Sequence, residues 1–197
     1  MRATLRGSQK RAIAAEAAAQ VPSGPVAIAL AGGSTVAGVL RCLEHRSDLT
    51  IVTNSVPIAL DAAERGRSRV LLAGGALEPQ SLELVGSLTE AMLKLLHVRI
   101  AIVGCDGISA EGGVTGHDDV AARTGHMLMT RADQVIVVAD GSKVGHTALA
   151  RSAEISRVHI LVTDSSADRD EVIRLSQAGV RVLVVGGDDT EPDAEDA

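Results

Sequence analysis

The sequence of 197 residues contains no Phe, Tyr or Trp. No aromatic ring is therefore available to stack on a nucleobase, a flavin or a sugar face, so a ligand has to be held by hydrogen bonds, charge and aliphatic contacts. Hydrophobic residues nevertheless make up 46% of the chain, and a chain of this length can bury a continuous core. We expect one α/β domain whose core is built from Val, Leu, Ile and Ala.

Cysteine is also scarce. Cys42 and Cys105 lie too far apart in the sequence for a metal-binding pair and provide no disulfide framework. This usage is typical of a reducing cytoplasm, and no apolar run reaches the length of a signal peptide or a membrane span. The six histidines show no metal-ligand spacing. We therefore expect a cytoplasmic protein with no membrane partner, no metal and no cofactor.

The net charge of −6 comes from the C-terminal end. Residues 186–197 carry six acidic residues and no basic residue, and the rest of the chain has 19 of each sign. The last segment is therefore predicted to be an acidic, disordered tail. The neutral body lacks the basic surface that binds nucleic acid by charge alone.

Seven short apolar segments alternate with helical patterns along the chain. The first predicted strand begins at Val26, and the others are Leu49–Thr53, Arg69–Ala73, Val98–Val103, Gln134–Ala139, His159–Thr163 and Val180–Val185. The predicted helices include Ser8–Val21, Glu83–Leu96 and Asp168–Ala178, and residues 108–118 are predicted to form a loop. Strands that are apolar throughout are typical of a parallel sheet covered on both faces. We predict a three-layer, Rossmann-like α/β fold with a mainly parallel sheet.

The stretch from Val26 to Val39 has the pattern of a buried strand that passes through Gly32 and Gly33 into a helix. Ser34 or Thr35 can cap this helix, and the glycines let the backbone approach a ligand. Free N–H groups and the positive end of the helix dipole then point at a phosphate or a carboxylate. We interpret this stretch as a candidate anion-binding turn.

Small polar residues also follow the other predicted strands, as in Thr53-Asn54-Ser55, Gly104-Cys105-Asp106-Gly107 and Asp140-Gly141-Ser142-Lys143. The carboxyl ends of parallel strands lie along one edge of the sheet, where ligands bind at a switch in strand order. These segments are therefore expected to meet the anion-binding turn at one site. Small donors, one lysine and no aromatic side chain suit a small phosphorylated or polyhydroxylated molecule.

Several named motifs are absent. Thr35 stands where the dinucleotide-binding fingerprint needs a glycine, and Val39 stands where a P-loop needs its lysine. The sequence also lacks the Gly-x-Ser-x-Gly motif of α/β-hydrolases. These absences disfavour dinucleotide, nucleoside triphosphate and serine-hydrolase functions.

An ordered set of short motifs resembles the C-terminal effector-sensing domain of the DeoR family of bacterial transcriptional regulators. The resemblance extends from about Ser8 to Val185, and its motifs are Ala-Gly-Gly-Ser-Thr at 31–35, Thr-Asn-Ser-Val-Pro-Ile-Ala at 53–59, Leu-Ala-Gly-Gly at 72–75, Leu-Val-Gly at 84–86, Gly-Cys-Asp-Gly-Ile at 104–108, Glu-Gly-Gly-Val-Thr at 111–115 and Ala-Asp-Gly-Ser-Lys-Val-Gly at 139–145. The resemblance implies a non-enzymatic domain, related to ribose-5-phosphate isomerase, that binds a sugar phosphate and thereby changes the affinity of a repressor for its operator.

The resemblance also implies a set of effector-binding residues. They are Gly33, Ser34, Thr35, Asn54 and Ser55 at the phosphate, Asp106 and Gly107 at the sugar hydroxyls, Lys143 as a charge-assisted donor, and Arg123 in place of a basic pair that the family carries one turn later. The family usually has an acid where Ala31 stands, so the identity of the effector is left open.

The same resemblance divides the chain into a residual linker at 1–7, a sensing domain at 8–185 and the acidic tail at 186–197. Seven residues cannot contain the helix-turn-helix head of the family, so DNA would be bound only through an N-terminal domain outside this sequence. The family also implies a homo-oligomer.

Three alternatives stay open. The chain could be a sugar-phosphate isomerase that uses Asp106 as general base, although Glu111 stands where the isomerases have a lysine before a glycine cluster. Asp106 could simply cap a turn, and Lys143 could be a solvated loop residue. The chain could also be a truncated regulator with no role of its own.

Overall fold

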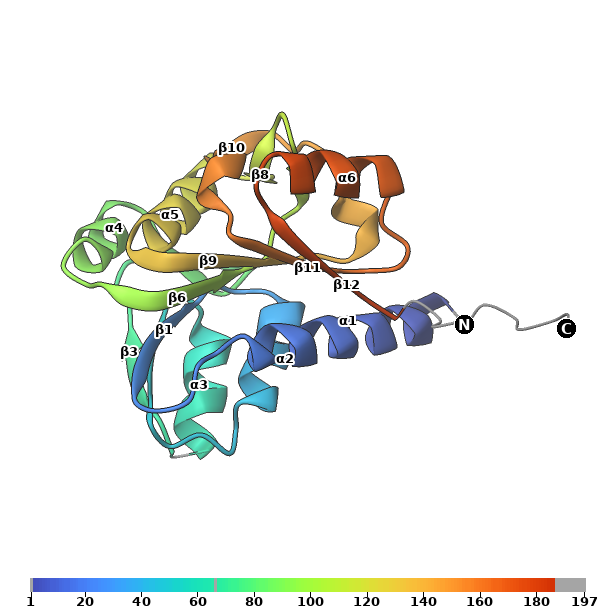
Figure 1. Cartoon of the computed structure of the whole chain (residues 1–197). Coiled ribbons are helices and arrows are strands. Elements are labelled where there is room, and N and C mark those ends of the chain that lie inside the picture. Colours follow the sequence, from blue (N-terminus) through green and yellow to red (C-terminus); the bar gives the residue numbers. More distant parts are fainter. Residues whose placement is uncertain (1, 66, 187–197) are drawn as a thin grey trace, which may run out of the picture.

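The computed structural model describes residues 2–65 and 67–186 and is built around one seven-stranded sheet (Figure 1). Its strands are β1 Val26–Leu30, β2 Leu49–Thr53, β3 Arg69–Leu72, β6 Val98–Val103, β9 Ala132–Val138, β11 Ile160–Asp164 and β12 Arg181–Val185. They lie in the order β12-β11-β9-β6-β1-β2-β3, and all neighbours pair in parallel. The prediction of a mainly parallel, Rossmann-like sheet is confirmed.

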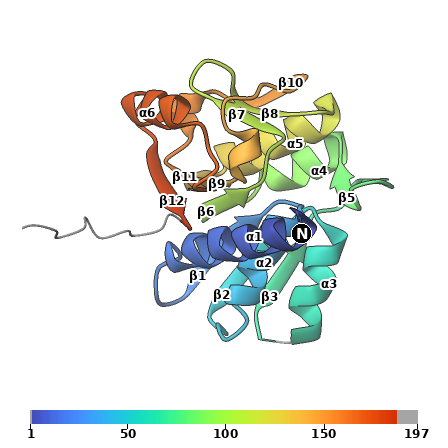
Figure 2. The same ribbon diagram turned by 90° about the vertical axis from the view of Figure 1, so that its right-hand side faces the viewer.

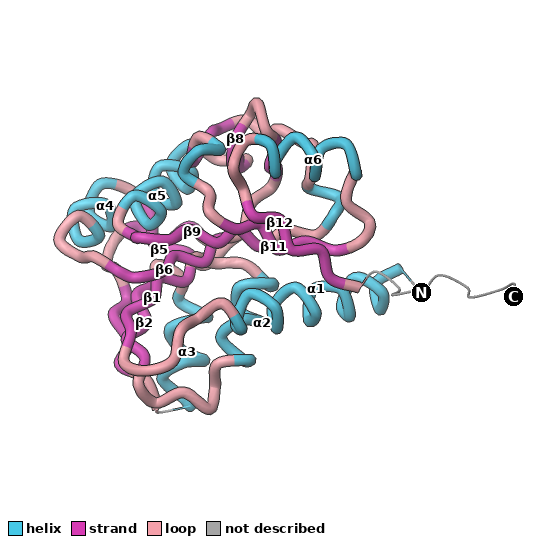
Figure 3. The backbone as a smooth tube through the Cα atoms, in the orientation of Figure 1, coloured by secondary structure: helices cyan, strands magenta, loops and turns pink. Residues whose placement is uncertain are grey.

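Three helices cover each face of the sheet (Figures 1 and 2). One face carries α1 Arg2–Ala19, α2 Ser34–Cys42 and α3 Val56–Arg65, and the other carries α4 Ser87–Leu93, α5 Asp119–Thr130 and α6 Arg169–Gln177. Figure 3 shows the strands as a layer between the two sets of helices. The strands alternate between the two cores: Ile28 and Leu30 pack toward α1 and α2, whereas Ala29 faces the core that contains Leu128 of α5. Because both faces are buried, the strands are apolar throughout.

The order of the strands reverses next to β1. The chain passes from β1 to β2 and β3 on one side, and then returns to place β6 on the other side of β1. The turns that follow β1 and β6 therefore diverge and leave a crevice at the carboxyl ends of these two strands. This crevice is where a parallel α/β sheet binds its ligands.

Five short strands were not predicted. They are β4 Ala76–Glu78, β5 Glu83–Val85, β7 Gly107–Ser109, β8 Gly113–Gly116 and β10 Ala150–Ala153. β4 and β5 form a hairpin, and β7, β8 and β10 form a small antiparallel sheet inside and beyond the segment 108–118 that was predicted to be a loop. Strands of three or four residues are too short to show the alternation on which a sequence-based assignment depends.

Two helix predictions were wrong at their ends. The helix predicted over Glu83–Leu96 begins only at Ser87 and ends at Leu93, because Gly86 has a φ of 92° and residues 83–85 form β5. The helix predicted from Ser8 begins at Arg2. The predicted acidic tail lies outside the described residues, except for Gly186. Within the described part of the chain, no helix combines the length and apolarity that crossing a bilayer requires.

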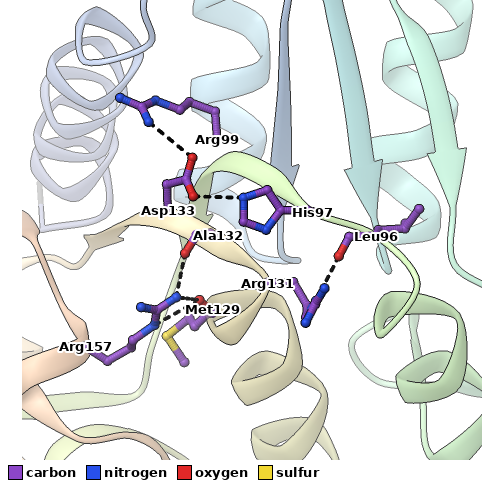
Figure 4. A network of polar contacts seen from close by, with 8 residues as sticks. All are labelled: Leu96, His97, Arg99, Met129, Arg131, Ala132, Asp133 and Arg157. Atoms are coloured by element: carbon purple, nitrogen blue, oxygen red, sulfur yellow. Dashed lines mark hydrogen bonds and ion pairs between the residues drawn. The ribbon is translucent and has the colours of Figure 1, made fainter.

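Arginine side chains fasten the end of α5 to the strands at the edge of the sheet opposite the crevice (Figure 4). Arg157, at the end of the 3₁₀ helix Ile155–Arg157, donates hydrogen bonds from Nη2 to the carbonyl oxygens of Met129 (2.8 Å) and Ala132 (2.5 Å). Arg131 Nε donates to the carbonyl oxygen of Leu96 (2.8 Å). The carbonyl of Met129 is among the last of α5, which have no partner inside the helix, and Arg157 supplies one. The carbonyls of Ala132 and Leu96 lie in β9 and in the segment before β6.

We expect Arg157→Met to lower the free energy of unfolding by about 1–3 kcal/mol, because it leaves two carbonyl groups without their charged donor. Arg151→Met is the matched control, since Arg151 makes an exposed ion pair with Glu154 (3.0 Å); it should change stability by less than about 0.5 kcal/mol. Urea denaturation measures both. Equal effects of the two substitutions would contradict this role of Arg157.

Candidate functional site

A cavity of about 560 Å³ opens at the switch point of the sheet. Its walls come from the turn after β1, the turn after β6, the β4–β5 hairpin, and the segment from β8 into α5. Two lysines, Lys10 and Lys143, also line it. The volume is in the range of small-molecule sites, and the lining contains backbone amides, hydroxyls and charged groups of both signs.

The turn after β1 has the geometry of an anion-binding turn. Gly33 is the N-cap residue of α2 and has a φ of 118°, a conformation that favours glycine. The amides of Ser34, Thr35 and Val36 belong to the first helical turn and have no carbonyl partner inside the helix. The prediction that Ser34 or Thr35 caps α2 was wrong, since both lie inside the helix and no side chain caps it. The positive end of the helix dipole consequently faces the cavity.

Lys10 of α1 reaches the same turn, and sequence analysis missed it. Its Nζ donates a hydrogen bond to Ser34 Oγ (3.0 Å), which places a positive charge beside the first turn of α2. One signal was available, because Lys10 lies three residues before Ile13 and seven before Ala17, both fully buried. A lysine in line with a buried helical stripe is directed toward the protein rather than away from it.

The turn after β6 contributes Asp106 on the opposite wall. Asp106 Oδ2 accepts a hydrogen bond from the backbone N–H of His117 (3.1 Å) and lies 3.6 Å from His117 Nδ1. Lys143, at the end of the 3₁₀ helix Gly141–Lys143, donates from Nζ to the carbonyl oxygen of Cys105 (2.6 Å). The cavity therefore offers a carboxylate acceptor and an ammonium donor at its second wall.

Cys105 also lines the cavity, but its thiol is not a nucleophile at neutral pH. Burial raises the pKa of the Cys105 thiol to about 12, and the nearby Lys143 charge opposes this shift without cancelling it. The reactive form of cysteine is the thiolate. Covalent catalysis through Cys105 is therefore disfavoured.

Glu83 of the β4–β5 hairpin extends into the cavity and was not predicted. Its Oε1 accepts a hydrogen bond from the N–H of Gly32 (2.7 Å), the residue that precedes the anion-binding turn. Burial raises the pKa of the Glu83 carboxyl, hydrogen bonds from Gly32 and Ser81 oppose the shift, and the charge of Asp106 adds to it. No local pattern indicates this contact, because residues 83–96 are predicted to form a helix.

Five of the nine residues proposed from the sequence lie around the cavity: Gly33, Ser34, Thr35, Asp106 and Lys143. The other four lie elsewhere. Gly107 is buried in β7, and Arg123 of α5 forms an ion pair with Glu90 of α4 (3.7 Å). Asn54 and Ser55 are buried at the end of β2 and pair with the β4–β5 hairpin instead.

Asn54 anchors this hairpin. Its side-chain Nδ2 donates to the carbonyl oxygen of Leu84 (3.2 Å), and its carbonyl oxygen accepts from the N–H of Leu84 (2.7 Å). Val56 N–H donates to the carbonyl oxygen of Leu82 (3.0 Å). Asn54 therefore influences the cavity indirectly, by holding the hairpin that carries Glu83.

Comparison with known proteins places this geometry in a family. The model of the DeoR C-terminal sensor domain matches residues 6–165. An HTH-type transcriptional regulator of Bacillus subtilis (strain 168) is 33% identical over 177 residues, which are 90% of this chain and 68% of that protein. The glycerol-3-phosphate regulon repressor of Escherichia coli (strain K12) is 29% identical over 164 residues, 83% of this chain and 65% of that protein. The chain spans about two thirds of the length of these relatives.

Solved structures agree on the fold. A ribose 5-phosphate isomerase from Plasmodium falciparum superposes with a TM-score of 0.50 at 20% identity, over 69% of this chain and 52% of that chain. A sor operon regulator from Shigella flexneri superposes with a TM-score of 0.51 at 12% identity, over 87% of this chain and 88% of that chain. The sheet and its crevice define an α/β domain of the ribose-5-phosphate isomerase type. The chain belongs to the DeoR family, as a C-terminal sensor domain of its transcriptional regulators.

The raised pKa of Glu83 predicts that the stability difference between the wild type and Glu83→Gln depends on pH. A carboxyl that holds its proton more tightly when folded binds more protons in the native state, so stability falls as pH rises above the ordinary carboxyl range. Glu83→Gln removes this dependence. As pH rises above the ordinary glutamate pKa of 4.5, we expect the free energy of unfolding of Glu83→Gln to increase relative to that of the wild type, as measured by urea denaturation at each pH. A constant difference would contradict the burial of this charge.

Proposed function

We propose that this domain senses a small phosphorylated sugar, or a related phosphorylated metabolite, for a DeoR-type transcriptional regulator. The observation that carries the proposal is the pairing of Lys10 with Ser34 at the open first turn of α2, inside the cavity at the switch point of the sheet. A lysine, a hydroxyl and free amides in one place favour a group with several anionic oxygens. The relative named glycerol-3-phosphate regulon repressor is consistent with this class of effector.

The two walls of the cavity suit the two ends of such an effector. Its phosphate would lie at Gly33, Ser34 and Thr35, with Lys10 supplying the charge. Its hydroxyls would lie between Asp106 and Lys143, since a carboxylate accepts and an ammonium donates hydrogen bonds. The chain has no aromatic residue for ring stacking, so a polyhydroxylated ligand fits this lining better than a nucleotide base.

The effector would act on transcription through the rest of the regulator. Relatives that share this domain are named HTH-type regulators, and we propose that such a segment binds the operator while this domain reports the effector. Lys10 belongs to the first helix of the domain, so a ligand held by Lys10 contacts the element that leads toward the N-terminus. Self-association of the regulator belongs to the same proposal.

We expect a sugar phosphate to bind this domain and to raise its thermal midpoint, because a ligand that binds only the folded state stabilises it. A panel of ribose 5-phosphate, glycerol 3-phosphate and other phosphorylated sugars, each paired with its unphosphorylated form, tests this by thermal shift and by calorimetric titration. Lys10→Ala and Ser34→Ala should each weaken binding, Lys10→Ala by about tenfold or more, since a charge-assisted hydrogen bond is lost.

Arg123→Ala is the control for this experiment. Arg123 carries a positive charge but lies outside the cavity, where it pairs with Glu90. Its removal should leave the affinity within about twofold. A larger loss of affinity would indicate that Arg123 contacts the ligand. Unchanged binding in both Lys10→Ala and Ser34→Ala would contradict the assignment of the phosphate to the first turn of α2.

The isomerase function is tested separately. Asp106 faces the cavity, and the fold is shared with ribose 5-phosphate isomerase, but shared fold does not imply shared chemistry. We expect no interconversion of ribose 5-phosphate and its ketose when the protein is followed by NMR over hours. Turnover that disappears in Asp106→Asn would contradict the non-enzymatic function.

A further inference from the structure

The cavity contains an anion of its own. The Glu83 carboxylate accepts the hydrogen bond of the Gly32 amide at 2.7 Å, directly before the turn that we assign to the effector phosphate. A carboxylate on a backbone amide at the start of a helix makes the kind of contact that a phosphate oxygen would make. Glu83 therefore imitates part of the ligand.

The fit between Glu83 and Gly32 is close. A side chain at residue 32 would place its Cβ 2.1 Å from Glu83 Oε1 and 2.6 Å from Glu83 Cδ, so this carboxylate can rest there only over a glycine. A hydrogen bond from Ser81 of the same hairpin steadies it. The contact is thus built by two segments that are 51 residues apart in the chain.

The hairpin that carries Glu83 is strained beside it. Leu82 has a φ of 55°, and among residues 2–65 and 67–186 it is the one non-glycine residue with a positive φ. Gly75 and Gly86 bracket β4 and β5 with φ values of 155° and 92°. Leu77 and Leu82 are exposed, whereas Val85 at the end of β5 is buried. The tip of the hairpin therefore has little apolar packing, and hydrogen bonds to Asn54 and Val56 hold its base. Little apolar packing is a property of segments that move.

We propose that Glu83 is an internal competitor for the anion-binding turn: it occupies the Gly32 amide, and the phosphate of the effector binds by displacing it together with the β4–β5 hairpin. This inference rests on the proposed function, because it assumes that the ligand is anionic at this turn. Two negative groups at adjacent amides repel each other strongly when water is excluded. Lys10 and Lys143 donate hydrogen bonds to neutral oxygens and keep their charges, so they offset part of that repulsion.

The competitor sets a threshold for the ligand. Inorganic phosphate gains only the contacts of the turn and Lys10. The cost of breaking the Glu83–Gly32 hydrogen bond therefore makes its binding weak. A complete effector also gains contacts at Asp106 and Lys143 and overcomes the same cost. Glu83 thereby makes the domain respond to a phosphorylated sugar and not to phosphate alone.

The experiment compares Glu83→Gln with Glu64→Gln by calorimetric titration with inorganic phosphate, with the phosphorylated sugars of the panel, and with their unphosphorylated forms. Glu64 is an exposed acid on α3 outside the cavity, so Glu64→Gln makes the same change in net charge away from the site. We expect Glu83→Gln to raise the affinity for inorganic phosphate and for the sugar phosphates by about tenfold or more and by a similar factor. Unphosphorylated sugars should show no gain, and Glu64→Gln should change all affinities by less than about twofold.

Hydrogen exchange provides a second readout that does not depend on affinity. Residues 76–85 should exchange faster when a sugar phosphate is added to the wild type, because the hairpin is released. In Glu83→Ala the same residues should already exchange at the faster rate before ligand is added. Slower exchange on binding would overturn the displacement of the hairpin.

The outcomes separate this inference from the proposed function. If the wild type binds sugar phosphates and Lys10→Ala weakens them, but Glu83→Gln is neutral or weakens them too, then Glu83 contacts the effector and only this inference is overturned. An equal gain in Glu64→Gln would mean that net charge alone raises the affinity, and it would also overturn this inference. If neither the wild type nor Glu83→Gln binds any phosphorylated ligand, the proposed function fails and this inference fails with it.

Discussion

The parallel pairing of β1 with both β2 and β6 is the constraint on which the rest of the structure depends. It makes β1 the point where the strand order reverses, and it separates the turn after β1 from the turn after β6. Every group assigned to the effector is placed relative to these two turns. Lys10 lies at the cavity because α1 packs along α2, and Glu83 lies there because Asn54 at the end of β2 holds the β4–β5 hairpin.

The sheet could be predicted from the sequence because each long strand is buried on both faces and reads as an apolar run. Ile28, Ala29 and Leu30 alternate between two cores, so no polar residue interrupts them. The short strands could not be predicted in this way, since β5 has three residues and its conformation depends on pairing with β4. Gly86, with a φ of 92°, separates β5 from α4 inside the range predicted as one helix, and a glycine at this position was a local signal of the boundary.

The site residues also fall into those that a local pattern predicts and those that tertiary contacts bring to the site. Gly33, Ser34 and Thr35 could be predicted because they follow a strand directly and share one local turn. The contacts of Lys10 and Glu83 could not, because they join residues 24 and 51 positions apart and depend on how α1 and the hairpin pack. The position of Lys10 beside the buried stripe of α1 indicates only that its side chain is directed toward the protein. Asn54 had the chemistry of a ligand-binding residue, but its backbone carbonyl and its side-chain Nδ2 are engaged by Leu84. A polar residue at a strand end can serve the site by holding another segment in place.

The central claim is that the phosphate of the effector lies on the first turn of α2. NMR titration of the ¹⁵N-labelled domain with the panel of phosphorylated sugars tests this claim most directly, because it reports each backbone amide separately. The account predicts that the largest shifts occur at the amides of residues 32–36, and that the amides of the β4–β5 hairpin shift with the same saturation curve. Saturable binding that shifts other amides and leaves residues 32–36 unchanged would contradict it.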